Sequence, residues 1–148
     1  MLTIVRHTRN NKIPMQHIVI DTNCLVQMIS LHSPYRKGWD AFLNGNYVLC
    51  VSNDIIEEYQ EILGIVANET VASNIVYAIL RSPFTHFCDP QFKFQLIEKD
   101  NDDNKFVDCA IIANARFIVS QDHHFDILKT ITFPKVDVIS IDDFMETL

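Results

Sequence analysis

Short runs of apolar residues alternate along this chain with longer segments whose apolar side chains recur at helical spacing. The short runs are typical of buried strands, and the longer segments are typical of amphipathic helices. We expect strands at 17–20, 47–51, 84–88, 117–120 and 136–140. We expect helices at 22–31, 36–44, 53–66, 69–81, 104–115, 124–129 and 142–147. Strands that alternate with helices predict an α/β fold, in which helices cover both faces of a mainly parallel sheet.

The chain is expected to form a single domain over residues 17–148, because its 148 residues contain no repeat, low-complexity tract or internal linker. Residues 1–16 are interpreted as an N-terminal extension. This extension is basic but has no long apolar stretch, so it does not resemble a secretory signal. It is either a disordered segment or a stretch that precedes a true start at Met15.

The charge and the cysteines restrict the class of protein. A net charge of −7 counts against a protein that coats nucleic acid, although a nuclease remains open because bound divalent cations change the sign of the local field. The four cysteines, at positions 24, 50, 88 and 109, have no paired spacing. This argues against zinc fingers and a disulfide framework, and it favours reduced thiols in the cytoplasm. No stretch is long enough for a membrane span, so no membrane association is expected.

Two aspartates follow predicted strands. Asp21 comes directly after the strand 17–20, and Asp122 comes two residues after the strand that ends at Ser120. The carboxyl ends of parallel strands share one edge of a sheet, which is where open α/β sheets bind their ligands. We therefore expect the two carboxylates to lie close together. The alternative for each is a helix N-cap, a common role that contributes about 1 kcal/mol.

Two further acids lie in predicted helices. Asp108 belongs to a helix that is apolar on nearly every side, where a carboxylate is costly unless it is paired, coordinated or protonated. Glu58 lies on the flank of the amphipathic helix 53–66, from which it can point along the sheet edge. Asp103 is a fifth candidate, for which capping the helix that carries Asp108 is the preferred role and metal binding the second.

A cation is needed if these acids converge. Two like charges 4 Å apart repel by about 4 kcal/mol at an effective dielectric constant near 20. A fold gathers several carboxylates when a cation compensates them or when some stay protonated. Carboxylate oxygens are hard ligands that suit Mg²⁺ or Mn²⁺ and argue against zinc. The hypothesis is therefore a divalent-metal site at the edge of the sheet.

At this point the sequence resembles the PIN-domain proteins, and within them the group described as toxins of prokaryotic toxin–antitoxin pairs. The resemblance covers residues 17–145. It is carried by Ile18-Val19-Ile20-Asp21-Thr22-Asn23, by Ser52 with Ile56-Glu57-Glu58-Tyr59-Gln60-Glu61-Ile62-Leu63, by Asp102-Asp103-Asn104-Lys105-Phe106-Val107-Asp108-Cys109-Ala110, and by Ala115-Arg116-Phe117-Ile118-Val119-Ser120-Gln121-Asp122.

The resemblance implies a three-layer α/β/α sandwich with a Rossmann-like parallel sheet, and a Mg²⁺- or Mn²⁺-dependent ribonuclease that hydrolyses RNA phosphodiester bonds. By position, it implies four acids that are catalytic and bind the metal: Asp21, Glu58, Asp108 and Asp122. It also implies a fifth recurring acid, Asp103, and two polar residues that support the metal ligands, Asn23 and Ser120. It also implies an RNA substrate and a small antitoxin partner, and PIN toxins often form homodimers.

Two other interpretations are open. A PIN fold without turnover could act as a binding module through a protein partner, although the complete set of acids argues against that. A metal-dependent phosphatase commonly needs a second aspartate two residues after the first, and Asn23 occupies that position.

The pair His123-His124 could contact substrate, with surface histidines as the alternative. Four basic residues could steer RNA, although solvated charges are the commoner role: Arg36, Lys37, Arg81 and Arg116.

Overall fold

The computed structural model describes residues 15–89, 93–98 and 101–148. Most of the expected N-terminal extension, 1–14, lies outside the described residues, and the first strand begins at His17 as expected. The described chain forms one five-stranded sheet in the order β3-β2-β1-β4-β5. All four pairings between neighbouring strands are parallel, which confirms the expected α/β fold.

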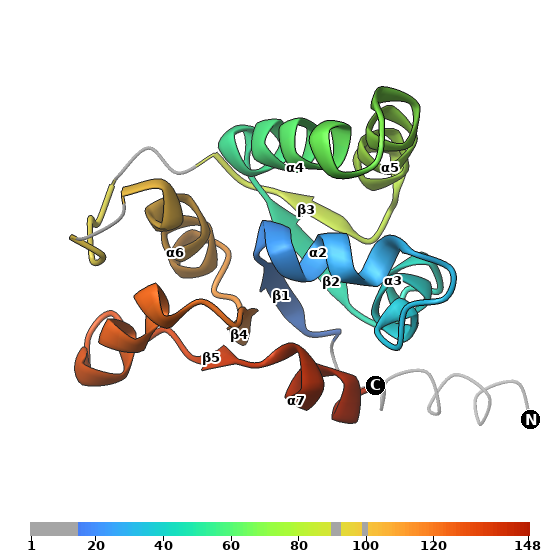
Figure 1. The fold of residues 1–148 in the computed structure, drawn as a ribbon. Helices are drawn as coiled ribbons and strands as arrows, with labels where there is room; N and C mark the ends of the chain where they lie inside the picture. Colours follow the sequence, from blue (N-terminus) through green and yellow to red (C-terminus); the bar gives the residue numbers. More distant parts are fainter. Residues whose placement is uncertain (1–14, 90–92, 99–100) are drawn as a thin grey trace, which may run out of the picture.

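The helices and strands fall close to their expected positions (Figure 1). The strands are β1 (His17–Ile20), β2 (Val48–Val51), β3 (Thr85–Phe87), β4 (Phe117–Val119) and β5 (Val138–Ile139). The α-helices are α2 (Thr22–Ile29), α3 (Arg36–Leu43), α4 (Asn53–Val66), α5 (Glu69–Arg81), α6 (Asn104–Ile112) and α7 (Ile141–Glu146). Two 3₁₀ helices, η1 (Asn101–Asp103) and η2 (His123–Thr130), precede α6 and follow β4.

The end of α6 differs from the sequence prediction. The helix was expected to reach residue 115, but it ends at Ile112. Asn114 adopts a left-handed conformation with φ of 51°, which asparagine tolerates better than most residues. The backbone N–H of Ala115 then turns back to the carbonyl of Ala110 at 2.8 Å. The local conformation of Asn114 therefore ends the helix before the apolar pattern does.

The strand order places a topological switch point beside β1. The chain leaves β1 towards β2 on one side and returns to β4 on the other side, so the crevice lies outside the carboxyl ends of β1 and β4. Ile20 pairs with Val119 at these ends. The next residue, Asp21, donates its backbone N–H to the carbonyl of Val119 at 3.0 Å.

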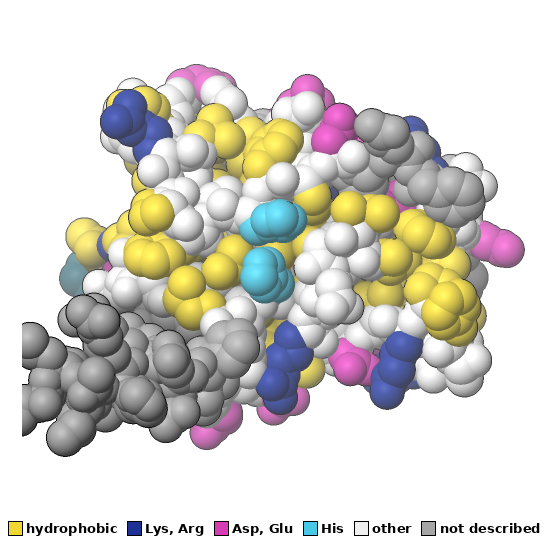
Figure 2. Space-filling model, turned by 180° about the vertical axis from the view of Figure 1, so that it is seen from behind, with side chains coloured by type: hydrophobic (Ala, Val, Ile, Leu, Met, Phe, Trp, Pro, Cys, Tyr) yellow, Lys and Arg dark blue, Asp and Glu magenta, His cyan; other side chains and the backbone are white. Residues whose placement is uncertain are grey.

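Helices pack against both faces of the sheet. Right-handed crossovers place α2 to α5, from the β1–β2 and β2–β3 connections, on one face and α6 on the other. Figure 1 shows α4 and α5 side by side, with α6 beside β4 and in contact with α4. From behind, the surface carries several apolar patches, and its Lys and Arg side chains stand apart from one another (Figure 2). No helix in the described ranges is long and apolar enough to cross a membrane.

Tyr59 ties α4 to the end of β1. Its side chain is fully buried, and its hydroxyl donates a hydrogen bond to the carbonyl of Ile20, directly before Asp21. Desolvation by burial raises the pKa of the Tyr59 phenol well above its ordinary value, so the hydroxyl keeps its proton and remains a donor. This bond fixes the backbone from which Asp21 projects.

Replacing Tyr59 by Phe removes this hydrogen bond while keeping the ring. We expect the free energy of unfolding to fall by about 1–2 kcal/mol, because a buried carbonyl loses its partner. Urea denaturation measures the change. The matched control is Tyr77→Phe on α5, which makes the same chemical change at a side chain that is 61% exposed. Equal effects at the two positions would contradict the role given to Tyr59.

Candidate metal centre

Asp21 is held by hydrogen bonds to both of its carboxylate oxygens. Oδ1 accepts the backbone N–H of Cys24 at 2.9 Å, so Asp21 is the N-cap of α2. Oδ2 accepts the hydroxyl of Ser120, which follows β4. The residue is only 5% exposed. Desolvation by burial raises the pKa of Asp21 above its ordinary value, against the opposing effect of the Ser120 and Cys24 bonds, and nearby Asp122 raises it further.

Ser120 connects the two strand-end aspartates. Its hydroxyl oxygen also accepts the backbone N–H of Asp122 at 3.0 Å. The Asp122 side chain in turn caps η2 by accepting the backbone N–H of His124 at 2.9 Å. Asp21 and Asp122 therefore both cap helices, as the alternative interpretation expected, and they also lie together at the sheet edge.

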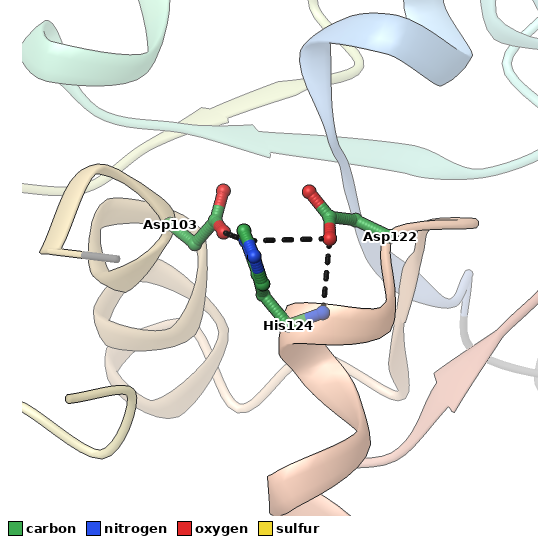
Figure 3. A group of neighbouring side chains, drawn as sticks. All are labelled: Asp103, Asp122 and His124. Atoms are coloured by element: carbon green, nitrogen blue, oxygen red, sulfur yellow. Dashed lines mark hydrogen bonds and ion pairs between the residues drawn. The ribbon is translucent and has the colours of Figure 1, made fainter. Parts of the chain in front are cut away.

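A second convergence brings together Asp103, Asp122 and His124 (Figure 3). The imidazole Nδ1 of His124 lies 3.0 Å from Oδ2 of Asp103 and 3.4 Å from Oδ1 of Asp122. One donor atom from each residue lies within 4.8 Å of the other two. Figure 3 shows the ring between the two carboxylates, one from the start of α6 and one from the turn after β4.

The preferred role of Asp103 in the sequence prediction was wrong. Asp103 occupies the N-cap position of α6, but its side chain makes no capping hydrogen bond. Its backbone is helical there, with φ of −76° and ψ of −20°, because η1 runs directly into α6. An N-cap normally has an extended backbone, so the carboxylate is turned instead towards His124.

Glu58 is linked to the Asp21 end of α2 through Thr22, the residue that follows Asp21. Its Oε2 accepts the hydroxyl of Thr22, and its Oε1 pairs with Nζ of Lys105 at 2.8 Å. Three helices, α2, α4 and α6, thus meet at one glutamate. The Glu58 and Lys105 side chains are 24% and 18% exposed, so both reach the surface of a cleft.

Asp108 lies in that cleft and outside the group formed by Asp103, Asp122 and His124. Asp108 and Glu58 line a cavity of about 390 Å³ together with Lys93 and Lys105. Oδ1 of Asp108 accepts the backbone N–H of Phe94 at 3.2 Å. Desolvation by burial raises the pKa of Asp108, and the opposing effects come from the Phe94 bond and from Lys93.

The comparisons with known proteins agree with this architecture. The family profile described as PIN domain matches residues 17–124, which include every acid discussed above. The chain belongs to the PIN domain family. A comparison with curated proteins gave no match.

Two solved structures show the same PIN fold. The toxin VapC20 of Mycobacterium tuberculosis, described as cleaving the sarcin–ricin loop, is 12% identical with a TM-score of 0.56, over 74% of this chain and 92% of that chain. VapBC2 from Rickettsia felis, solved with a DNA fragment from its promoter, is 18% identical with a TM-score of 0.57, over 84% of this chain and 98% of that chain. At these identities the likeness concerns the fold.

The donor set of this PIN domain fits a hard divalent cation. Asp103 and Asp122 offer carboxylate oxygens and His124 offers one nitrogen, all within 4.8 Å of one another, and Asp21 is linked to Asp122 through Ser120. Mg²⁺ and Mn²⁺ prefer oxygen ligands, and Mn²⁺ also accepts imidazole. Of the two expected supporting residues, Ser120 lies at the centre of the site, and Asn23 lies in the first turn of α2 with an exposed side chain.

Reasoning from the sequence missed three contributors to this site. From the sequence, His124 is given a substrate contact or a surface role, Lys105 is considered only as a poorly placed partner for Asp108, and Thr22 is given no role in the site. For Thr22 and Lys105 a signal existed, since each lies within two residues of a candidate acid in a motif of the PIN resemblance. For His124 the signal was its place two residues after Asp122, where an aspartate N-cap brings the next turn back towards its own carboxylate.

The direction of the Asp108 pKa gives a stability prediction. A carboxyl whose pKa is raised by folding contributes stability that is present below its unfolded pKa and is lost as the pH rises through its folded pKa. At about pH 7 the ionised group therefore opposes folding. We expect Asp108→Asn to raise the melting temperature at neutral pH and to lose this advantage towards pH 4, as measured by thermal denaturation.

A surface variant controls for the loss of one negative charge. Asp137→Asn removes the same charge from a side chain that is 61% exposed and pairs only loosely with Lys135 at 3.8 Å. Its effect should stay within about 0.5 kcal/mol at either pH. If Asp108→Asn destabilises the protein at neutral pH, or matches the control, the inference that burial of this carboxylate opposes folding is wrong.

Proposed function

We propose that this PIN domain is a metal-dependent endoribonuclease that hydrolyses RNA phosphodiester bonds with Mg²⁺ or Mn²⁺. The observation that carries the proposal is the convergence of Asp103 and Asp122 beside Asp21, at the switch point of a parallel sheet. Open α/β sheets bind their ligands at such crevices. Three carboxylates at one edge repel one another, and a divalent cation relieves that repulsion.

Each residue has a distinct role in the proposed site. Asp21, Asp103 and Asp122 hold the ion, and Ser120 orients Asp21 through its hydroxyl. Glu58 and Asp108 line the adjoining cavity, where their carboxylates would add negative charge close to a bound ion. The chemistry that such an ion supplies is Lewis acidity and neutralisation of the charge that develops on the scissile phosphate.

The cleft has two cationic side chains that can contact an RNA backbone, among six carboxylates: Asp54, Glu57, Glu58, Glu61, Asp102 and Asp108. Lys93 and Lys105 line the same cavity as Glu58 and Asp108. Lys105 is held by Glu58 at 2.8 Å, so its ammonium group lies beside the acids and can donate to a phosphate oxygen. The net charge is −7, and basic side chains stand apart on the rear face (Figure 2). With so few basic side chains in the cleft, a bound divalent cation would be needed for RNA phosphates to approach its acids.

We further propose that the protein is the toxin of a toxin–antitoxin pair, with a small antitoxin as its partner. Support comes from the fold shared with VapC20 and VapBC2. Large apolar side chains exposed on α4 and α5, Ile65, Val66, Tyr77 and Leu80, offer a protein-binding surface, either for this partner or for a second copy in a homodimer. A reading frame for a small protein beside this gene would support the pairing.

The direct test is cleavage of RNA by the purified protein. We expect cleavage of single-stranded or hairpin RNA with Mg²⁺ or Mn²⁺, and none with EDTA. Asp103→Asn and Asp122→Asn should each lower the rate by about 100-fold or more, since each removes a charged ligand without changing shape. Asp108→Asn should lower it by roughly tenfold, because its carboxylate lies in the cavity and not in the cluster.

The control is Asp126→Asn, which removes a negative charge from η2, the helix that Asp122 caps. Asp126 is 57% exposed and pairs with His123 and Lys129 on the surface, so its substitution should leave the rate unchanged. Cleavage that persists in Asp103→Asn and Asp122→Asn, or in EDTA, would overturn the assignment. Tight binding of Mn²⁺ without cleavage of any RNA would instead favour a PIN fold that acts as a binding module.

A further inference from the structure

We infer that His124 is itself a ligand of the ion, so that the site is a mixed carboxylate–imidazole centre that discriminates in favour of Mn²⁺ over Mg²⁺. The inference rests on the proposed function, because it concerns the same ion. It adds a nitrogen ligand that none of the predicted acids supplies. It also assigns the metal preference of the protein to a single side chain.

The first support is the spacing of the donor atoms. Ligands at about 2.1 Å from an octahedral ion lie about 3.0 Å from their neighbours. Nδ1 of His124 lies 3.0 Å from one carboxylate and 3.4 Å from the other, and the three donors fit within 4.8 Å. The three atoms are thus already near the separations of one coordination shell. An ion could be bound between them with little movement of the side chains.

The second support is the rigidity with which His124 is placed. Its backbone N–H donates to Oδ1 of Asp122 at 2.9 Å, the same oxygen that its ring approaches. The next residue, Phe125, is 1% exposed and packs against Phe106 of α6 with ring centroids 6.5 Å apart. This packing joins η2 to the helix that begins beside Asp103. The core thus fixes the backbone of η2 beside Asp103, from which the His124 side chain, 44% exposed, reaches both carboxylates.

The neighbouring histidine shows what a surface role looks like. The His123 side chain is 95% exposed, and its Nδ1 lies 3.3 Å from Asp126 on the same short helix. It has no carboxylate from another element beside it in the described structure. The two adjacent histidines thus form a natural matched pair, in which only His124 faces the candidate metal centre.

Ligand chemistry then sets the selectivity. Mg²⁺ binds oxygen almost exclusively and keeps several waters, whereas Mn²⁺ and the later divalent ions accept imidazole nitrogen. Three carboxylates alone would serve both ions. An imidazole in the set gives Mn²⁺ one bond that Mg²⁺ uses poorly. The expected consequence is a difference in affinity between the two ions that depends on His124.

Electron paramagnetic resonance of Mn²⁺ bound to the full chain, without RNA, tests this directly. We expect pulsed measurements on the wild type to detect coupling to a directly coordinated ¹⁴N. The coupling should vanish in His124→Ala and persist in His123→Ala. His124→Ala should also weaken Mn²⁺ binding by about tenfold or more while changing Mg²⁺ binding by much less, as measured by competition.

The outcomes separate this inference from the nuclease proposal. A wild type that binds Mn²⁺ without ¹⁴N coupling, or an equal loss of affinity for both ions in His124→Ala, would overturn the role of His124. RNA cleavage in Mg²⁺ by the same preparation would then leave the nuclease proposal standing. Coupling that depends on His124 in a protein that cleaves no RNA would confirm the ligand and overturn the nuclease.

Discussion

The repulsion between carboxylates gathered at the edge between β1 and β4 is the constraint on which this molecule depends. The register that pairs Ile20 with Val119 brings the residues after both strands together. Ser120 then bonds the side chain of Asp21 and the backbone of Asp122. Burial raises the pKa of Asp21, which means that the ionised group is disfavoured where the fold holds it. The bonds from Ser120 and Cys24 offset part of this cost, and a cation at the same edge would offset more of it.

Helix capping and the proposed metal binding fall on the same side chains. Asp21 and Asp122 each cap a helix with one oxygen, and each also faces the crevice. The choice between helix capping and metal binding that the sequence leaves open is therefore not exclusive. Capping fixes the carboxylate on a rigid element, and a fixed carboxylate is a better-oriented ligand. Asp103 reaches the same cluster by the opposite route, since it makes no capping bond.

The positions of the strands and helices could be predicted well from the sequence. Each such element leaves a periodic pattern of apolar residues within one continuous segment of the chain. All five strands lie within their expected ranges, and Asp21 and Asp122 follow from strand ends alone. The meeting of Asp103 with His124 depends instead on how α6 and η2 pack, through Phe106 and Phe125. A helix apolar on all sides indicates that Asp108 is buried, but it gives no direction for its side chain. Side-chain direction across packed elements has no periodic signal in the sequence.

The central claim is that the acids of the β1–β4 edge enclose one divalent cation, and crystallography with Mn²⁺ tests it most directly. Anomalous difference density collected at the manganese absorption edge locates the ion without assumptions about activity. The predicted result is a peak between the carboxylates of Asp103 and Asp122, beside Asp21 and the ring of His124. Manganese bound only at surface acids such as Asp126 and Asp137, with no peak at this edge, would contradict the claim.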